Sequence, residues 1–298
     1  MTGDPRMLFA AIEAGGTKFV CGIGSSKGSL RTEVIPTTDP AETLSRVEAF
    51  LDAAIAEFGP IAAIGIGSFG PLDLDPASPG HGRILATPKP GWEGTDMPAR
   101  LRARFGVPVG IDTDVNAAAF AEMRLHGVDN LAYVTVGTGI GAGIVVQGRT
   151  MRGLGHPECG HIAVARHPAH ADFAGICPYH GDCLEGMASG PALQAAWGAS
   201  ASHLPEDHPA WDAQADYLGQ LCVTLILTVA PQRIVLGGGV MNRPFLLERV
   251  RAATLRRLNG YCVQWDAAKA NEALLPPRSP EAPGLVGSYL IAEAASEQ

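Results

Sequence analysis

Two segments of the sequence share one pattern, in which an apolar strand enters a glycine turn and leaves it as a second apolar strand. They span residues 8–24 and 131–148, and mixed strand-like and helix-like segments follow each of them. Two copies of such a unit in one chain predict a duplicated α/β domain. The sequence contains no short-period repeat and no low-complexity tract that would suggest a solenoid or a disordered linker.

The chain between the two copies alternates between strand and helix periodicity. Residues 40–58 place apolar side chains on one helical face, and Asp39 stands where it could cap the first turn. Residues 61–71 and 107–114 contain the continuous apolar runs that are typical of buried parallel strands. Residues 115–126 are rich in alanine and are predicted to be helical.

Other parts of the chain have less regular patterns. Residues 72–94 contain too many prolines and glycines for an element, and a loop of that length is usually functional. The chain is predicted to become helical from Trp211 onward, with one last strand at residues 234–239 and two helical stretches at the end.

The composition indicates a globular protein and narrows the choice of partners. Hydrophobic residues make up 46% and charged residues 17% of the 298 residues. The net charge of −8 argues against nucleic-acid and membrane-surface binding, which require a basic face. No apolar run is long enough to cross a membrane, and the apolar run near the start is too short for a signal peptide. Six dispersed cysteines then indicate free thiols or metal ligands in a cytoplasmic protein.

The first glycine turn has the sequence E-A-G-G-T-K over residues 13–18. It lacks the GxxxxGK[ST] spacing of a Walker A loop. A two-glycine turn can still bring backbone N–H groups against phosphate oxygens, with Thr17 and Lys18 beside it. An ordinary hairpin turn remains an equally good interpretation of this motif alone.

The second glycine turn, G-T-G-I-G-A-G over residues 137–143, leads into an apolar strand. A dinucleotide-binding fingerprint needs its glycines to open a helix, so this context excludes that interpretation. Two glycine turns at the same place in two halves of a chain could grip phosphates from opposite sides. Such a pair would suit ATP.

Carboxylates stand at the end of a predicted strand, in the run I-D-T-D-V-N over residues 111–116. The carboxyl ends of strands are where α/β folds place their active sites. Asp114 or Asp112 could therefore accept the proton of a substrate hydroxyl during phosphoryl transfer. The alternative is that Asp114 only caps the helix that follows.

Histidine and cysteine crowd into residues 156–186. His161, Cys177, His180 and Cys183 form a ligand set in which two-residue spacings let a loop wrap one tetrahedral ion. Four protein ligands would close the site, so a structural zinc ion is predicted. Chance crowding is the alternative, and a zinc hydrolase would need an open coordination position that this set does not leave.

Taken together, these motifs resemble the ROK (repressor, open reading frame, kinase) family, and within it the bacterial fructokinases. The resemblance covers the chain from about Phe9 to its last helix. It rests on the following pieces in this order: EAGGTK, GSFGPLDL, TPKPGW, DTDVNAAA, VTVGTGIGAGI, GHPECGH, CPYHGDCLEG and LGGGV. The family implies an α/β, actin-like ATPase (ribonuclease H-like) fold of two lobes with a cleft between them. We expect residues 1–115 with a C-terminal helix at 284–298 in the small lobe, and residues 116–283, with the zinc loop, in the large lobe.

The resemblance also implies roles for individual residues. Asp114 would be the catalytic base, and Mg²⁺ would accompany the ATP. The residues implied in ATP binding are Gly15, Gly16, Thr17, Lys18, Thr138, Gly139, Gly237, Gly238 and Gly239. Those implied in sugar binding are Gly70, Pro71, Thr113, Asp114, Glu158 and His161, of which His161 would also bind the zinc ion.

This sequence departs from the commoner family pattern at three positions. Glu13 replaces an Asp in the first glycine turn, and His180 replaces a cysteine in the zinc loop, which zinc tolerates. Thr113 stands where glucose-type members place an Asn, which weakens a glucokinase interpretation. The TPKPGW run resembles the fructokinase branch, and Trp92 is expected either to line the sugar site or to anchor its loop.

The prediction is therefore an ATP-dependent hexose kinase that phosphorylates D-fructose to fructose 6-phosphate. Mannose, glucose or an N-acetylhexosamine remain alternative substrates, and a non-catalytic sugar-binding protein of the same fold is the alternative class. The first strand begins too near Met1 for a preceding helix-turn-helix, so no DNA-binding role is expected. A homodimer is expected from the family.

Overall fold

The computed structural model describes residues 7–297, and the chain within it forms two compact units. The first unit comprises the chain up to Leu125, then Thr150–His156, and the chain from Ser279 onward. The second unit comprises His126–Arg149 and Pro157–Arg278. The predicted lobes met at residues 115 and 284, so the observed first unit is larger, because it includes the helix after the predicted boundary and the inserted segment Thr150–His156.

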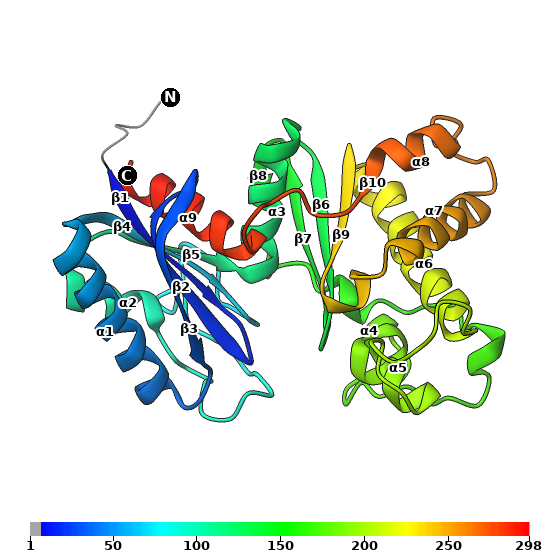
Figure 1. Cartoon of the computed structure of the whole chain (residues 1–298), viewed down its shortest axis with the longest axis horizontal. Coiled ribbons are helices and arrows are strands. Elements are labelled where there is room, and N and C mark those ends of the chain that lie inside the picture. Colours follow the sequence, from blue (N-terminus) through cyan, green and yellow to red (C-terminus); the bar gives the residue numbers. More distant parts are fainter. Residues whose placement is uncertain (1–6, 298) are drawn as a thin grey trace. The chain divides into compact units, whose positions relative to one another are not determined.

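The first unit contains a five-stranded sheet in the order β3-β2-β1-β4-β5 (Figure 1). β1 is antiparallel to β2 and parallel to β4, and β4 is parallel to β5. The strands are β1 (Leu8–Ala14), β2 (Lys18–Ser25), β3 (Gly28–Pro36), β4 (Ile61–Ser68) and β5 (Val109–Thr113). The carboxyl ends of the parallel strands β1, β4 and β5 therefore lie at one edge of this sheet.

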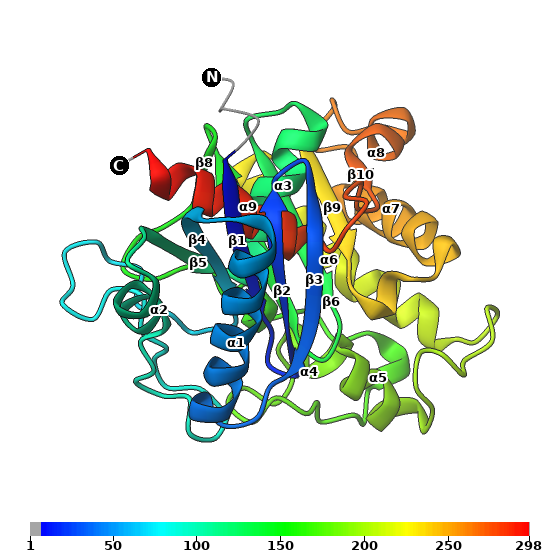
Figure 2. The same ribbon diagram turned by 60° about the vertical axis from the view of Figure 1, so that its left-hand side comes forward.

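Helices cover both faces of the first sheet, as Figure 2 shows for α1 and α9. The helices of this unit are α1 (Pro40–Phe58), α2 (Met97–Phe105), α3 (Asp114–His126) and α9 (Pro283–Ser296). The predicted cap of the first helix is confirmed, because the Asp39 side chain accepts a hydrogen bond from Glu42 N at 3.0 Å. α9 lies directly on β4, where a Cβ on Gly65 would come within 1.9 Å of Ser288 O.

The long segment between β4 and α2 is irregular, as its prolines and glycines predict. Trp92 fixes it to the first unit. Its ring is fully buried against Phe19 and Phe69, and its Nε1 donates to Thr38 O at 2.8 Å. Of the two roles considered for Trp92, the structure therefore supports the loop anchor.

The second unit repeats the arrangement of the first around another five-stranded sheet, in the order β10-β9-β6-β7-β8. β6 is antiparallel to β7 and parallel to β9, as β1 is to β2 and β4. The strands are β6 (Leu131–Val136), β7 (Ile140–Val146), β8 (Arg149–Thr150), β9 (Arg233–Gly237) and β10 (Leu274–Leu275). The predicted duplication of a strand–glycine turn–strand unit is thus confirmed.

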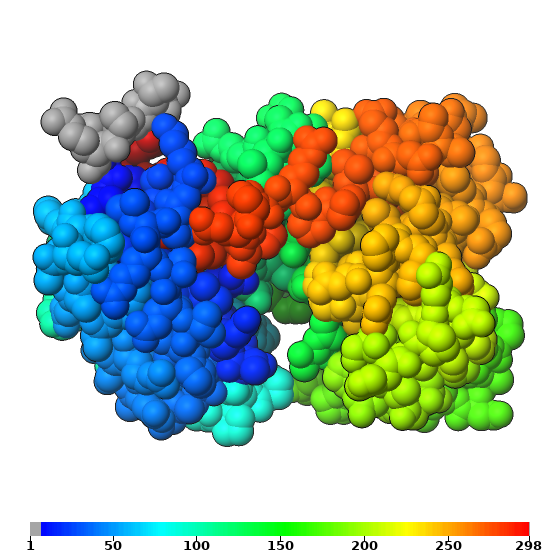
Figure 3. Space-filling model, in the orientation of Figure 1, coloured from blue at the N-terminus to red at the C-terminus, as the bar shows by residue number. Residues whose placement is uncertain are grey.

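The helices of the second unit lie between and after these strands. They are α4 (Leu184–Ala188), α5 (Gly190–Trp197), α6 (Ala210–Val229), α7 (Pro244–Leu258) and α8 (Ala267–Ala273). The orange surface in Figure 3 belongs to the α8 region and the chain after it. The strand predicted at residues 234–239 is present as β9, but it is not the last one, since β10 follows, and three helices rather than two close the chain. A two-residue strand has no periodicity that a sequence can display.

Two further expectations concern the chain as a whole. None of the helices between residues 7 and 297 has the length and apolarity to cross a membrane. All six cysteines are free in the structure.

Candidate active site

The first glycine turn joins β1 to β2 in the first unit. Gly15 N donates to Lys18 O at 3.0 Å, and a Cβ on Gly15 would lie 2.8 Å from that same oxygen. Thr37, the residue after β3, supports the turn, because its Oγ1 donates to Gly15 O at 2.7 Å. Gly16, Thr17 and Lys18 are exposed at the tip. The turn thus presents backbone N–H groups and an ammonium group to solvent, as a phosphate site requires.

Glu13 lies at the end of β1, immediately before this turn. Its carboxylate accepts a hydrogen bond from the N–H of Leu285, at the start of α9, and burial raises its pKa while nearby Lys18 opposes that rise. Oε2 of Glu13 is buried without a hydrogen-bond partner among residues 7–297. A buried carboxylate oxygen without a donor is suited to a cation or to an ordered water bound to one.

Asp114 lies where β5 passes into α3. Thr113 Oγ1 accepts a hydrogen bond from Asn116 N at 3.1 Å, so Thr113 caps the helix. The capping role that the sequence allowed for Asp114 therefore belongs to its neighbour. Asp114 is half-buried and its Oδ1 accepts from Val115 N at 2.8 Å. The carboxylate thus lies in the first helical turn, beyond the carboxyl end of a parallel strand.

Gly70 and Pro71 follow β4 and are joined by a cis peptide bond. The next residue, Leu72, donates its N–H to Nε2 of His156 at 3.1 Å. A Cβ on Gly70 would lie 3.2 Å from Leu72 N and 3.3 Å from that imidazole nitrogen, so this part of the loop is closely packed. Both predicted sugar-binding positions therefore lie at the same edge of the first sheet as Asp114.

The second glycine turn joins β6 to β7 in the second unit. Gly137 N donates to Gly139 O at 2.8 Å, and Gly190 N donates to Gly137 O at 2.8 Å. Glu185 supports the turn with its side chain, since its Oε2 accepts from Ile140 N at 2.9 Å. Thr138 is exposed at the tip.

Gly237 is the last residue of β9, and Gly238 and Gly239 follow it in the same unit. Gly238 has a φ of 91°, and a Cβ there would lie 2.5 Å from Val136 N. Only glycine can occupy that position, because any side chain would meet the backbone of β6. This glycine run therefore brings the end of β9 into close contact with the end of β6.

The predicted metal ligands lie together in the second unit. The ligand atoms of His161, Cys177, His180 and Cys183 are all within 4.8 Å of one another. His161 Nδ1 is 3.7 Å from Cys177 Sγ and 3.5 Å from Cys183 Sγ, and His180 Nδ1 is 3.7 Å from Cys177 Sγ. A tetrahedral zinc ion with ordinary Zn–S and Zn–N lengths separates its sulfur and nitrogen ligands by about 3.6 Å. The donor set fits such an ion.

Sequence reasoning missed Glu185, which connects the metal ligands to the glycine turn. One carboxylate oxygen accepts from Ile140 N, while the other lies 4.0 Å from Nε2 of His161. A carboxylate beside the second nitrogen of a ligating imidazole is the common arrangement at zinc sites. The only signal in the sequence was an acidic residue two positions after Cys183.

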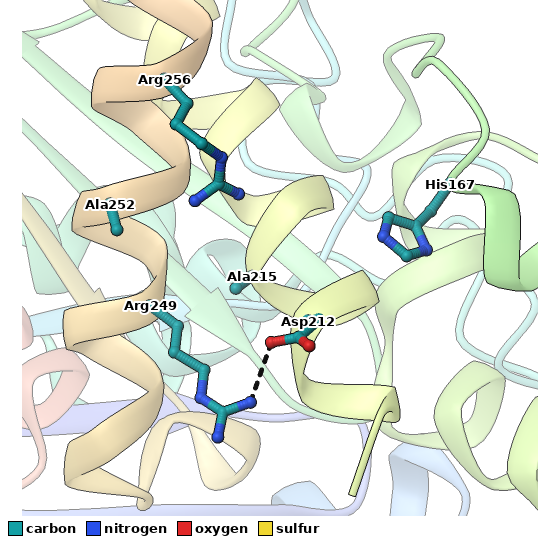
Figure 4. Close-up of a pocket in the computed structure, with 6 residues that line it drawn as sticks. All are labelled: His167, Asp212, Ala215, Arg249, Ala252 and Arg256. Carbon is teal, nitrogen blue, oxygen red and sulfur yellow. Dashed lines mark hydrogen bonds and ion pairs between the residues drawn. The ribbon is translucent and has the colours of Figure 1, made fainter. Parts of the chain in front are cut away.

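A separate pocket of about 400 Å³ in the second unit contains none of the predicted site residues (Figure 4). Its lining side chains project from α6, α7 and the residue before a 3₁₀ turn. They are His167, Asp212, Ala215, Arg249, Ala252 and Arg256. Arg249 is held by Asp212 at 2.9 Å across this pocket.

Each unit thus collects its own share of the predicted residues. The first unit holds the turn with Lys18, the sugar-binding candidates Gly70, Pro71 and Thr113, and Asp114. The second holds the turn with Thr138, the glycines after β9, exposed Glu158 and the metal cluster.

Comparison with known proteins identifies the relatives of the chain. The ROK family model matches residues 9–295. Fructokinase of Zymomonas mobilis is 41% identical over 302 residues, covering 99% of both chains. Fructokinase of Pediococcus pentosaceus is 41% identical over 293 residues, covering 97% of this chain and 99% of the relative.

Solved structures agree with these sequence relatives. The ROK hexokinase of Thermus thermophilus has a TM-score of 0.79 and 29% identity, with 98% of this chain and 99% of that chain covered. A ROK glucokinase of Streptomyces griseus, solved with glucose and AMPPNP, has a TM-score of 0.73 and 25% identity, with 96% and 99% covered. The fold and these likenesses define a sugar kinase, and the predicted actin-like α/β fold is confirmed. Within that class, the chain belongs to the ROK family.

Proposed function

We propose that the chain is a fructokinase that transfers the γ-phosphoryl group of ATP to the 6-hydroxyl group of D-fructose. The observation that carries this proposal is the 41% identity to the Zymomonas mobilis fructokinase over 99% of both chains. The position of Asp114 in the first turn of α3 supports the chemistry. The substrate class and the reaction thus have independent support.

Asp114 is the base in the proposed mechanism. Its carboxylate takes the proton from the sugar hydroxyl as that oxygen forms a bond to the γ-phosphorus. The bond between the γ-phosphorus and the oxygen bridging to the β-phosphorus breaks, and ADP leaves with that electron pair. Thr113 caps the helix, which holds the backbone of Asp114 in a fixed orientation.

The two glycine turns bind the phosphates of ATP in this proposal. Lys18 supplies a positive charge, Gly16 and Thr17 supply N–H groups, and Gly15 shapes the turn through its own hydrogen bond to Lys18 O. Thr138 and Gly139 do the same without a cation, and Gly237, Gly238 and Gly239 contact the adenosine. Glu13 would help to hold the Mg²⁺ ion that accompanies ATP, since its Oε2 is buried and unpartnered among the described residues. When bound, that ion neutralises phosphate charge during the transfer.

The sugar-binding residues are proposed on the same basis. Gly70 and Pro71 lie after β4, and Thr113 is buried with its hydroxyl oxygen engaged in the helix cap. With one lone pair engaged by Asn116 N, the Thr113 hydroxyl offers a sugar one donor and one remaining acceptor on a single atom, whereas an Asn would offer a donor and an acceptor on separate atoms. Glu158 and His161 complete the set from the second unit.

A structural zinc ion is proposed for the four-ligand cluster. Four protein ligands leave no open position for water, so the ion would stabilise the fold rather than act in chemistry. Metal analysis of the purified protein tests this directly, with one equivalent expected. Protein that binds no zinc, even after the thiols are kept reduced, would overturn the assignment.

The test of function is ATP-dependent phosphorylation of a hexose panel, measured by coupled ADP release. Turnover is expected to be highest with fructose, and Asp114→Asn should lower kcat by at least about 10²-fold, within the range for loss of a general base. Sugar and nucleotide binding by that variant should remain measurable by calorimetry. Preference for mannose, glucose or an N-acetylhexosamine would keep the kinase and change its substrate. No turnover with any hexose would favour a binding protein.

A cytoplasmic location and a homodimer remain predictions that follow from the family. Sedimentation of the purified chain over a range of concentrations tests the second, with a species of twice the 31.0 kDa monomer mass expected. A monomer at all concentrations would contradict it.

A further inference from the structure

Residues 150–156, called the strap below, belong to the first unit although the chain on both sides of them belongs to the second. The strap carries none of the predicted catalytic or binding residues. It is nevertheless fixed at two points, and each point is next to a predicted sugar-binding segment.

The first attachment is to Asp112, which is 2% exposed at the end of β5. Its Oδ2 accepts from Arg152 Nη2 at 2.6 Å and from Thr150 Oγ1 at 2.9 Å. Its Oδ1 accepts from Thr113 N at 2.8 Å and from Asn116 Nδ2 at 2.8 Å. One buried carboxylate therefore ties the strap to the strand–helix junction that carries Thr113 and Asp114.

This attachment is energetically important because the carboxylate is buried. An ionised carboxylate removed from water needs a cation and a full set of donors, and breaking such a pair is costly. Arg152 supplies the cation, while its own side chain is 37% exposed. Without Arg152, the buried Asp112 carboxylate would keep only neutral donors. The strand–helix junction that carries Thr113 and Asp114 would be expected to rearrange.

The second attachment is to the loop after β4. Nε2 of His156 accepts the N–H of Leu72, the residue that follows Gly70 and Pro71. The imidazole also lies in contact distance of Gly70, where a Cβ would come within 3.3 Å of Nε2. The strap thus holds the backbone of this loop as well as the end of β5.

We propose that the strap is a positioning element for the phosphoryl acceptor, with Arg152 and His156 as its positioning residues. This proposal rests on the proposed kinase function. The strap holds the Gly70–Pro71 loop and the Thr113–Asp114 junction in one fixed arrangement, so that the base and the acceptor sugar meet in reactive geometry. The turn that carries Lys18 has its own support from Thr37. Disturbing the strap should therefore affect the sugar far more than ATP.

The first experiment compares Arg152→Met with Arg152→Lys, and uses Arg149→Met as the matched control. Arg149 is exposed in β8, and its side chain makes no hydrogen bond or ion pair with the described part of the chain. Arg152→Met should lower kcat/KM for fructose by about 10²-fold, the scale of a misplacement of about 1 Å, with the KM for ATP within about twofold of the parent. Arg152→Lys keeps the charge and should recover most of the loss. Arg149→Met should match the parent.

The second experiment tests the other attachment with His156→Phe and His156→Gln. Phenylalanine keeps a ring but cannot accept from Leu72 N, whereas a glutamine amide oxygen can take the place of Nε2. His156→Phe should lower kcat/KM for fructose by roughly tenfold, the value of about 1.4 kcal/mol, and His156→Gln should lower it less. Equal losses in both variants would show that the acceptor role of His156 is irrelevant.

Two outcomes would overturn the proposal while leaving the kinase intact. One is an Arg152→Met variant whose KM values for fructose and ATP rise together. The other is an Arg152→Lys variant that is as impaired as Arg152→Met. If the parent protein phosphorylates no hexose, the proposed function fails, and amide hydrogen exchange then tests the strap alone. Faster exchange at Leu72 and Thr113 in Arg152→Met supports the strap, and unchanged exchange refutes it.

Discussion

The two glycine turns occupy equivalent places in the two sheets, yet they are held and charged differently. The first turn presents Lys18 and is supported by a neutral hydroxyl, that of Thr37. The second presents no cation among its residues 137–139 and is supported by a carboxylate, that of Glu185. The two turns therefore join equivalent strands but differ in charge and in hydrogen bonding, because Gly15 N donates to Lys18 O whereas Gly137 N donates to Gly139 O.

This difference predicts different electrostatic roles for the two turns. In the proposed kinase, the exposed ammonium group of the first turn would neutralise developing phosphate charge, whereas the second turn would offer neutral donors, its N–H groups and the Thr138 hydroxyl. The acid also lies next to His161, so the second turn is connected to the proposed metal site and the first is not. We expect loss of the metal to disturb the second turn far more than the first.

Removal of the metal should give the largest effect. Structural zinc contributes about 10–16 kcal/mol of apparent binding free energy in small zinc-finger peptides, so even a fraction of that would destabilise the second unit by several kcal/mol. Chelation, or Cys183→Ser, should lower the Tm and increase amide exchange at residues 137–146 and 177–188. Exchange at residues 8–25 should not change.

The control for this experiment is Cys262→Ser, because Cys262 is a free cysteine outside the ligand cluster. It should keep both the metal and the Tm. Equal loss of protection in the two glycine turns after chelation would break the proposed asymmetry.

Replacement of the turn side chains should have the next largest effect. Lys18→Met should lower kcat/KM for ATP by about 10²–10³-fold, as for loss of a donor that stabilises transition-state charge. Thr138→Val removes one neutral hydroxyl and should cost about tenfold or less. Steady-state kinetics with saturating fructose measures both, and equal losses would contradict the idea that only the first turn carries charge.

Alanine substitutions in the turns should give smaller effects of unequal size. A Cβ on Gly15 would lie 2.8 Å from the backbone oxygen of Lys18, whereas a Cβ on Gly139 would meet only the side-chain end of Glu185, at 2.6 Å. A backbone atom cannot yield without distorting the turn. Gly15→Ala should therefore cost about 1–3 kcal/mol of unfolding free energy, and Gly139→Ala less than about 1 kcal/mol. Denaturant unfolding of both variants decides the order.

The smallest expected effect is a difference in pH dependence between the units. His170 is buried in the second unit, and burial lowers its pKa. Its contribution to stability is complete above its unfolded pKa of about 6.5 and is lost as the pH falls below that value. His170→Phe should reduce the loss of unfolding free energy between pH 7 and 5, by less than the one-proton limit of about 1.4 kcal/mol per pH unit.

Glu13 in the first unit should behave in the opposite way. Burial raises its pKa, so the ionised form destabilises the fold near neutral pH and the cost disappears as the pH falls. The unfolding free energy contributed by Glu13 therefore falls as the pH rises, opposite to that of His170, and Glu13→Gln should remove this dependence. Identical pH profiles for the two variants and the parent would show that neither group matters.

Residues close together in the sequence carried most of what could be predicted. The first helix, its Asp39 cap and the two strand–turn–strand units each follow from local periodicity and turn chemistry. The spacing of Cys177, His180 and Cys183 likewise indicated a common loop, and their ligand atoms lie together.

Contacts between distant residues could not be predicted, because no local pattern records them. Glu185 meets Ile140 across 45 residues, and Arg152 meets Asp112 across 40. Thr113 caps its helix although Asp114 has an equally suitable side chain, since the choice depends on where the strand ends. Such partners are decided by tertiary packing rather than by propensity.

The position of α9 has a consequence for the order of synthesis. Leu285, Tyr289 and Ala292 of this last helix pack with Phe9 and Ala63 in one apolar cluster on the first sheet. Domains fold as the chain leaves the ribosome, from the N-terminus onward. The first sheet is therefore begun before the second unit but completed after it, and until residues 283–296 have been made, one apolar face of that sheet lacks its helix. A nascent chain stalled before residue 283 would offer that face to chaperones, while every residue of the second unit would already have been made.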